Sequence, residues 1–295
     1  MRLDSAQLNA FATVIDEGSF ERAAAVLHVT RSAVSQRVKL LEERVGQVLV
    51  RRATPCTPTE AGQALYRHAR EVALSETDAL ATIGGGQHTS TRLAIGVNAD
   101  SLATWFPHAM AQAAEGQSIT FDIHVEDQDH SANLLREGRV MAAVTADPQP
   151  VQGCKVLPLG TLRYRALASP AFMQRYFSQG VTAAALATAP MLVFNRKDAL
   201  QARFVGRITR RKLTPPVHWL PEAHAFVMAT RAGLGWGMTP DPMVQHDLEA
   251  GTLVELIPGK PVDVPLYWQS WRLNVQALHH MTEAVQRAAG LTLLR

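Results

Sequence analysis

Cysteine, aromatic residues and long apolar runs are all scarce in this sequence of 295 residues. Cys56 and Cys154 are its two cysteines, and they lie far apart in the chain, which argues against a disulfide framework and suits a reducing cytoplasm. We interpret Cys56 as a plain free thiol rather than a redox switch. No apolar run approaches the ~20 residues that span a bilayer, and the N-terminal segment lacks a signal-peptide core. We therefore expect a cytoplasmic protein that does not associate with membranes.

The sequence also lacks the short motifs of common hydrolases, metalloenzymes and redox proteins: H-E-x-x-H, G-x-S-x-G and C-x-x-C are all missing. His279 and His280 are adjacent, so on a helix they point in different directions and make a poor metal pair. The glycines of residues 233–237 enter a predicted strand instead of following one, which is the wrong context for a dinucleotide-binding fingerprint. We therefore predict no catalytic residue, no metal site and no cofactor.

What the sequence does contain is a pattern of two short amphipathic helices in residues 19–46. Apolar residues recur at helical spacing on both sides of a turn: Phe20, Ala23, Ala24 and Leu27 before it, and Val34, Val38 and Leu41 after it. Ser19 and Thr30 are suited to cap the two helices, and Val29 in the turn can pack beneath both. The pattern predicts a helix-turn-helix with residues 31–44 as the recognition helix.

The segment after this helix pair predicts a wing. Residues 47–50 favour a short strand, Arg51 and Arg52 follow, and a Pro-containing stretch of residues 53–58 leads to a new helix at Thr59. Two amphipathic helices with a short loop also occur in proteins that do not bind DNA. The wing makes the DNA-binding interpretation the stronger one.

Basic residues are concentrated in this region. Between Arg31 and Arg52 there are six basic residues against two acids, although the whole chain has a net charge of only +3. Such a local excess is typical of a surface that binds a polyanion. We predict that the side chains that read base edges in double-stranded DNA are Ser32, Ser35 and Gln36. The side chains predicted to hold phosphates are Arg31, Arg37, Lys39, Arg51 and Arg52.

These residues resemble the N-terminal domain of LysR-type transcriptional regulators. The resemblance rests on the run FERAAAVLHVTRSAVSQRVKLLEERVG, the Arg51-Arg52 pair and the T-E-A-G of residues 59–62. It implies an activator or repressor of transcription, associated with the bacterial nucleoid, that acts on promoter DNA and RNA polymerase. It also implies a homodimer, and a dimer of dimers that bends DNA.

Residues 59–83 read as one long helix, with Leu65, Val72 and Leu80 forming an intermittent apolar stripe. A solvated connector is one interpretation. The resemblance implies instead a linker helix that pairs with the same helix of a second subunit. The three glycines that follow indicate a hinge at residues 84–91 rather than a phosphate-binding loop.

From residue 91 onward, predicted strands and helices alternate, which indicates an α/β fold with a parallel sheet. The first unit has strands at residues 93–97, 119–125 and 140–144, and helices at 102–114 and 131–137. The second has strands near residues 163–168, 191–194, 217–220 and 235–238, and helices near 198–207, 223–232 and 242–249. A strand at 266–271 and a helix at 275–289 close the chain.

The resemblance implies that this closing pair returns to the first unit, giving two lobes as in type 2 periplasmic binding proteins. The expected organisation has a winged helix-turn-helix, mainly α, at residues 1–58 and a linker helix at 59–83. A hinge then occupies residues 84–91. The effector domain has lobe I at 92–161 and 267–295, and lobe II at 162–266.

Ligands of open parallel sheets collect beyond the carboxyl ends of the strands. Residues 98–105 form a polar turn that leads into a helix, where Ser101 and Thr104 could hold a carboxylate; simple helix capping is the alternative. Glu126, Asp127 and Asp129 follow the next strand, where they could neutralise a cationic ligand or form a solvated loop. Thr145 and Asp147 would face the same cleft.

The C-terminal region resembles one branch of the family, the arginine/lysine-responsive ArgP/LysG regulators of basic amino-acid export. The likeness rests on VNADSLATWF, VED, Ala225–Val227, Leu256–Gly259 and Leu266–Trp268. It implies that Ser101 and Thr104 hold the carboxylate of L-lysine or L-arginine, and that Glu126 and Asp127 face its cationic groups. The full set of effector contacts that we predict is Asn98, Asp100, Ser101, Thr104, Trp105, Glu126, Asp127, Thr145, Asn195 and Phe226.

One departure from that branch concerns the effector. After the predicted strand at residues 191–194, members of this branch commonly have an acidic residue, whereas this chain has Asn195, Arg196 and Lys197. If these positive charges face the cleft, they would oppose a basic ligand. The basic stretch of residues 203–212 we interpret as a solvated face. The predicted function is control of amino-acid export or metabolism genes. The alternatives are a non-basic effector, a nucleoid-type DNA binder without a ligand, and an enzyme with a DNA-binding appendage.

Overall fold

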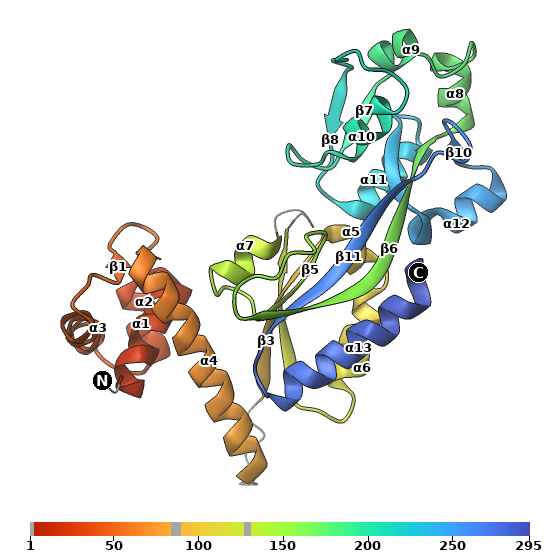
Figure 1. The fold of residues 1–295 in the computed structure, drawn as a ribbon. Coiled ribbons are helices and arrows are strands. Elements are labelled where there is room, and N and C mark those ends of the chain that lie inside the picture. Colours follow the sequence, from red (N-terminus) through yellow and green to blue (C-terminus); the bar gives the residue numbers. More distant parts are fainter. Residues whose placement is uncertain (1–2, 84–89, 127–130) are drawn as a thin grey trace.

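The computed structural model describes residues 3–83, 90–126 and 131–295, and its N-terminal domain is a winged helix-turn-helix (Figure 1). Thr30 caps the recognition helix by accepting the backbone N–H of Ala33 at 3.2 Å, and Asp4 and Ser19 cap the two earlier helices in the same way. The elements are α1 (Ser5–Glu17), α2 (Phe20–Val26), α3 (Arg31–Val45), β1 (Val50–Arg51) and β2 (Thr57–Pro58).

Small and apolar side chains pack the three helices together, as the periodicity predicts. Ala23 is fully buried where α2 meets its neighbours, Val34 and Leu41 are fully buried on α3, and Val29 packs against the same core from the turn. Burial of these side chains is the main stabilising term of so small a domain. The helix-turn-helix expected from the sequence is therefore confirmed.

An acidic residue fixes the wing to the recognition helix. Glu42 on α3 accepts the backbone N–H groups of Leu49 and Val50 at 2.8 and 3.2 Å. These two bonds hold residues 47–49 in a loop, so the strand expected at residues 47–50 is instead the short β1, paired antiparallel with β2. Arg51 lies in β1 and its side chain is exposed.

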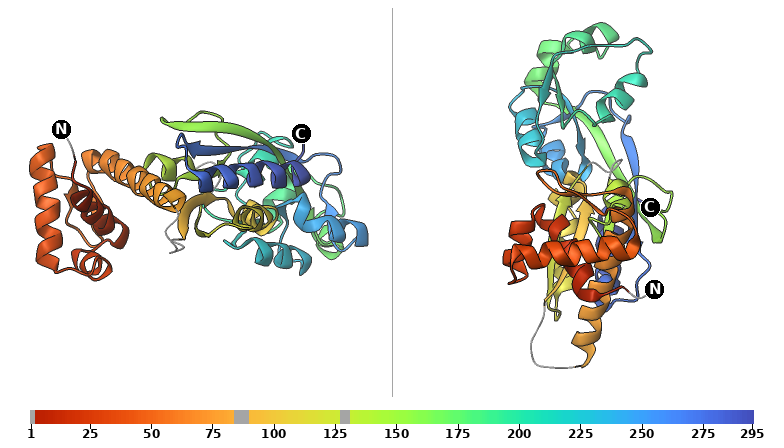
Figure 2. Two further views of the ribbon diagram at one scale, coloured as in Figure 1. Left: turned by 90° about the horizontal axis from the view of Figure 1, so that it is seen from below. Right: turned by 90° about the vertical axis from the view of Figure 1, so that its left-hand side faces the viewer.

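Helix α4 (Glu60–Ile83) contributes side chains to the cores of both domains. Tyr66 and Ala69 are buried against the helix-turn-helix, whereas Leu74 is buried in the core of the C-terminal domain. Figure 2 shows the N-terminal helices at one end of the molecule, joined to the rest through α4. The six residues 84–89 of the expected hinge lie outside the described residues, and Thr91 already begins a strand.

Arg67 of α4 connects the linker helix to the C-terminal domain. Its guanidinium donates to the carbonyl oxygen of Gln152 at 2.7 Å and lies 5.5 Å from the centre of the Trp271 ring. Gly138 and Gly153 both have positive φ and leave room for this side chain; a Cβ at Gly153 would come within 2.6 Å of it. The solvated-connector interpretation of α4 therefore does not hold for this part of the helix.

The C-terminal domain is built on a seven-stranded sheet with the order β10-β6-β11-β5-β3-β4, with β9 paired to β6 (Figure 1). In lobe I, β3 pairs in parallel with β4 on one side and with β5 on the other. Helices α6 and α13 of this lobe pack side by side. Its elements are β3 (Thr91–Val97), α5 (Ala99–Ala103), α6 (Phe106–Ala114), β4 (Ile119–Val125), α7 (Ser131–Arg136), β5 (Ala142–Thr145) and α13 (Gln276–Thr292).

Two long antiparallel strands, β6 (Cys154–Ala168) and β11 (Val262–Trp271), run from lobe I into lobe II. Lobe II also holds the parallel pair of β7 and β8. Its elements are α8 (Pro170–Tyr176), α9 (Ala183–Thr188), β7 (Met191–Val193), α10 (Leu200–Gly206), β8 (Val217–Trp219), α11 (Ala223–Arg231), β9 (Gly237–Pro240), α12 (Asp241–Ala250) and β10 (Val254–Glu255).

The return of β11 and α13 to the first unit is confirmed, but three details of the expectation are wrong. The strand expected at 163–168 begins at Cys154, and the one expected at 266–271 begins at Val262. The helix expected at 102–114 is two helices, because the chain leaves helical geometry at Thr104 with φ −121° and ψ −87°. The second unit is not a simple parallel repeat, since β9 pairs antiparallel with β6. No helix in the described part of the chain is long and apolar enough to cross a bilayer.

An ion pair between the exposed Arg231 and the buried Asp247 in lobe II yields a pH prediction. Arg231 donates to both carboxylate oxygens of Asp247 at 2.6 Å, and Thr252 adds a third bond at 2.8 Å. The bonds from Arg231 lower the pKa of the buried Asp247 carboxyl below its ordinary value.

Because the folded-state pKa is the lower one, the stabilisation is complete above about pH 4 and is lost as the pH falls through the folded-state pKa. Asp247→Asn should therefore lower the melting temperature at pH 7, by the equivalent of about 1–3 kcal/mol. The gap between variant and parent should narrow below about pH 4. Thermal unfolding of both proteins at pH values from 7 to 3 measures this difference in melting temperature. A difference that stays constant with pH would contradict a stabilising role for the ionised Asp247 carboxylate.

Candidate functional site

The side chains predicted to meet DNA lie on the outward side of α3 and on the wing. Arg31, Ser32, Gln36 and Lys39 are exposed, and Ser35 and Arg37 are half-buried between them and the core. Val34 and Val38, one turn apart on the opposite side, are fully buried. The recognition helix thus presents its polar face to solvent.

Several of these polar side chains already have partners within the domain. Arg31 pairs with Glu21 at 2.9 Å, and Lys39 pairs with Glu43 at 3.6 Å one turn further along α3. Both pairs are well exposed, so each contributes little to stability and can exchange for a phosphate. The Arg52 guanidinium lies 5.1 Å from the centre of the Phe20 ring, which positions it beside α2.

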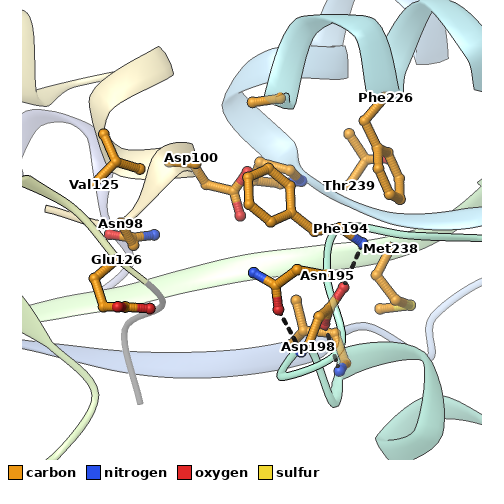
Figure 3. Close-up of a pocket in the computed structure, with 14 residues that line it drawn as sticks. Asn98, Asp100, Val125, Glu126, Phe194, Asn195, Asp198, Phe226, Met238 and Thr239 are labelled. Atoms are coloured by element: carbon orange, nitrogen blue, oxygen red, sulfur yellow. Dashed lines mark hydrogen bonds between the residues drawn. The ribbon is translucent and has the colours of Figure 1, made fainter. Parts of the chain in front are cut away.

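A second candidate site is a cavity between the two lobes, about 690 Å³ including the part open to solvent (Figure 3). Lobe I contributes the ends of β3 and β4, and lobe II contributes the loop after β7, helix α11 and strand β9. The residues that line it are Asn98, Ala99, Asp100, Val125, Glu126, Phe194, Asn195, Asp198, Leu200, Ala223, Phe226, Met238, Thr239 and Pro240.

Three polar side chains at or next to this cavity are buried without a hydrogen-bond partner among the described residues: Asn98 and Thr239, which line it, and Ser101, which follows Asp100 in the chain. Asn98 is 1% exposed, and neither its amide nitrogen nor its carbonyl oxygen is bonded. Ser101 on α5 and Thr239 on β9 are 0% and 1% exposed, and their hydroxyls are also unpartnered. Buried polar groups are nearly always hydrogen-bonded, because each unmet bond costs about 1–3 kcal/mol. These groups are available to a polar ligand.

The carboxylates at the cavity differ in what they bind. Asp198 accepts the backbone N–H groups of Phe194 and Leu200 at 3.1 and 2.9 Å, so it shapes the loop after β7. Asp100 accepts the hydroxyl of Tyr164 at 2.7 Å. Glu126, at the end of β4, accepts the Nζ of Lys197 at 2.9 Å. Glu126 is thus the carboxylate held by a charged side chain of the opposite lobe.

Not all of the predicted effector contacts come together. Asn98, Asp100, Glu126, Asn195 and Phe226 line the cavity, whereas Ser101 is fully buried and is not among the lining residues. Asp127 and Asp129 lie outside the described residues.

Thr104, Trp105 and Thr145 lie elsewhere. The Thr104 hydroxyl donates to the carbonyl of Asp100 at 2.6 Å, within its own helix. Trp105 is 2% exposed and packs edge-on against Phe106, and the Thr145 hydroxyl accepts the N–H of Asp147 at 3.1 Å. The structure therefore does not support these three as effector contacts.

Nine lining residues are not among the predicted effector contacts: Ala99, Val125, Phe194, Asp198, Leu200, Ala223, Met238, Thr239 and Pro240. Phe194 directly follows β7, and Thr239 and Pro240 end β9, so the carboxyl ends of two lobe II strands supply three of the nine. The rule that ligands collect at strand ends would have found Thr239 and Pro240 had it been applied to β9. Lys197 was expected to oppose a basic ligand if it faced the cleft, and its ammonium does meet Glu126.

Comparison with known sequences and structures matches both domains. Residues 5–63 match the bacterial regulatory helix-turn-helix proteins of the lysR family, and residues 86–291 match the LysR substrate binding domain. The chain is 49% identical over 290 residues to the transcriptional regulator LysG of Mycobacterium tuberculosis, covering 98% of this chain and 94% of that protein.

Two solved structures are similar over the whole length. The crystal structure of ArgP from Mycobacterium tuberculosis has a TM-score of 0.89 and 48% identity, covering 100% of this chain and 99% of the other. Full-length LysG from Corynebacterium glutamicum, described with bound effector Arg, has a TM-score of 0.82 and 40% identity, covering 99% and 100%. With both domains matched, the chain belongs to the LysR family of bacterial helix-turn-helix transcriptional regulators.

Proposed function

We propose that this regulator responds to a basic amino acid, L-arginine or L-lysine, bound in the cavity between the lobes. The observation that carries the proposal is that one cavity is lined by the Glu126 carboxylate and by the side chains of Asn98 and Thr239, which have no partner among the described residues. The buried, unpartnered hydroxyl of Ser101 follows Asn98 and Asp100 in the chain. The cavity thus offers an anionic acceptor together with neutral hydrogen-bond partners: Asn98 beside Glu126 in lobe I, and Thr239 across the cavity in lobe II (Figure 3). The bound arginine of the similar Corynebacterium glutamicum protein agrees with this chemistry.

The proposed contacts follow from the side-chain chemistry. The amide of Asn98 and the hydroxyls of Ser101 and Thr239 donate to the α-carboxylate of the ligand, and Glu126 accepts from its cationic end. The ring of Phe226 packs on the aliphatic part. Asp127 stays in the proposal as a second acceptor beside Glu126. The ligand is bound and released unchanged, so the domain is a sensor and not an enzyme.

Calorimetric titration of the full-length protein tests this proposal. L-arginine and L-lysine are the ligands, and L-leucine and L-glutamate are the controls. Saturable heat is expected from a basic amino acid alone. Heat from neither basic ligand, by protein that still binds DNA, would remove the proposed effector and leave the family assignment intact.

A non-basic effector is the second candidate, and Lys197 is the observation that favours it. Its ammonium already neutralises Glu126, so a ligand without a positive charge would meet no unpaired acid there. Saturable heat from L-glutamate alone in the same titration would select this candidate.

We propose that α3 reads DNA as a dimer. Ser32, Ser35 and Gln36 would contact base edges, and the basic residues of α3 and the wing would hold phosphates. Leu80 and Ile83 of α4 are 64% and 79% exposed, which supports pairing of this helix with that of a second subunit. A dimer of dimers in the bacterial cytoplasm would then alter the access of RNA polymerase to genes for amino-acid export or metabolism.

The proposed lobe boundaries are residues 92–161 with 267–295 for lobe I and 162–266 for lobe II. The pairing of β11 with β6 changes register between Leu266 and Tyr267, opposite Gly160. A break in the ladder at this point supports a bending position between the lobes. The proposed winged helix-turn-helix domain comprises residues 1–58, and the proposed linker helix comprises residues 59–83.

The wing supplies a prediction on DNA affinity. Arg51→Ala should weaken binding to a promoter duplex and to a scrambled duplex alike, by about fivefold at low salt, because a phosphate contact carries no sequence information. The slope of log affinity against log salt should fall by about one. Fluorescence anisotropy over a salt series measures both. Lys260→Ala removes an exposed charge in lobe II as the control, and an unchanged slope for Arg51→Ala would exclude the phosphate contact.

A further inference from the structure

One ion pair joins the lobes at the proposed effector cavity. The Nζ of Lys197, in the loop after β7 of lobe II, lies 2.9 Å from the Oε1 of Glu126, at the end of β4 in lobe I. The Lys197 side chain is 48% exposed and that of Glu126 is 31% exposed. Glu126 lines the cavity (Figure 3), and the contact is therefore a partly solvent-exposed one at the cavity wall.

The loop that carries Lys197 is held by its own hydrogen bonds. The side-chain oxygen of Asn195 accepts the backbone N–H of Lys197 at 2.7 Å and that of Asp198 at 3.2 Å. Asp198 in turn accepts the N–H of Phe194. The backbone of this turn is therefore fixed beside the cavity, and the flexible Lys197 side chain extends from it to the opposite lobe.

The neighbouring cation of the same loop is engaged elsewhere. The guanidinium of Arg196 lies 5.3 Å from the centre of the Trp219 ring, on β8 of lobe II. Of these two adjacent cationic residues, Arg196 therefore contacts its own lobe and Lys197 contacts the opposite lobe. The two side chains form a matched pair for experiment.

We propose that Lys197 is a specificity-determining residue that competes with the effector for Glu126. This inference rests on the proposed basic effector. In the ligand-free protein the Lys197 ammonium occupies the position that the cationic end of arginine or lysine would take. A basic ligand binds only after it displaces the Lys197 ammonium from Glu126. The positive charge of the ligand then takes the place of the Lys197 charge beside Glu126. Lys197 thereby weakens the affinity for basic amino acids and leaves neutral ones unaffected.

The test compares Lys197→Gln, Arg196→Gln and the parent protein by calorimetry. The probes are L-arginine and L-citrulline, which has nearly the same shape but no charge. Lys197→Gln should bind L-arginine about three- to tenfold more tightly, since an exposed ion pair and a like-charge repulsion are both removed. Its affinity for L-citrulline should not rise. Arg196→Gln should match the parent with both probes.

Each outcome decides between the two proposals. If the parent binds L-arginine and Lys197→Gln binds it no more tightly, competition by Lys197 is excluded while the effector stands. Equal gains for L-arginine and L-citrulline would show a general opening of the cavity and would also exclude competition. Failure of all three proteins to bind L-arginine would overturn the effector and this inference together. Thermal unfolding of both variants checks that they remain folded.

Discussion

Replacing Glu126 with glutamine should weaken binding of L-arginine by about thirtyfold, because the cationic end of the ligand loses its charged acceptor. The substitution keeps the size of the side chain and removes only its charge. A hydrogen bond to a charged group contributes about 1.5–3 kcal/mol, and we expect a loss of about 2 kcal/mol at Glu126, whose side chain is 31% exposed. Calorimetric titration measures the change.

Asp122→Asn is the matched control for this experiment. Asp122 lies on β4, the strand that Glu126 follows, and has the same side-chain exposure, 31%, but it pairs with Arg92 at 2.8 Å and is not among the residues that line the cavity. Its loss should leave L-arginine affinity within about twofold of the parent. If Glu126→Gln behaves like Asp122→Asn, Glu126 does not bind the effector, and the role of anionic acceptor passes to another residue.

The N-terminal domain could be predicted from the sequence because its signals are local. Capping side chains such as Ser19 and Thr30 precede helices whose apolar residues repeat every three or four positions. The packing that these patterns predict needs only neighbouring segments of the chain. The role of Glu42 could not be predicted from the sequence, because an acidic residue in a basic helix is usually a surface residue. Its function becomes clear only from the structure, in which its carboxylate accepts the backbone N–H groups of Leu49 and Val50.

The long strands were underestimated because β6 contains residues that usually end a strand. Pro158 has no N–H to donate, and Gly160 has a φ of +130°. Pro158 is tolerated because β6 pairs there with β11 alone. Gly160 is required because a Cβ would lie 2.7 Å from the carbonyl oxygen of Leu294. Both reasons depend on segments far away in sequence.

The effector cavity could be predicted only in part, for a similar reason. Strand ends identified Asn98 and Glu126, but the expected continuous helix at residues 102–114 placed Thr104 beside Ser101. The Thr104 hydroxyl instead donates to the carbonyl of Asp100, four residues earlier, in the way common for threonine on a helix. The contact of Lys197 with Glu126 joins two loops from different lobes, and no periodicity along the chain encodes that distance.

Gly62 is the position where the smallest substitution should most damage DNA binding. It lies in the first turn of α4, and a Cβ added there would be 2.1 Å from the carbonyl oxygen of Leu49 and 3.0 Å from its carbon. This carbonyl cannot move aside easily, because it accepts the N–H of Thr59 at 2.9 Å and the Thr59 hydroxyl also donates to Val48 at 2.7 Å. The wing and the linker helix are thus in direct backbone contact at Gly62.

Gly62→Ala should therefore displace the wing from α4, at a cost of about 3 kcal/mol from overpacking and lost hydrogen bonds. Because the wing carries Arg51, affinity for promoter DNA should fall at least about tenfold, as measured by fluorescence anisotropy. Binding of L-arginine, in the other domain, should not change. Gly290→Ala on α13, where nothing lies within 4 Å of the added Cβ, is the control and should leave both activities intact. Full DNA affinity in Gly62→Ala would mean that DNA binding does not require the wing to stay packed on the linker helix.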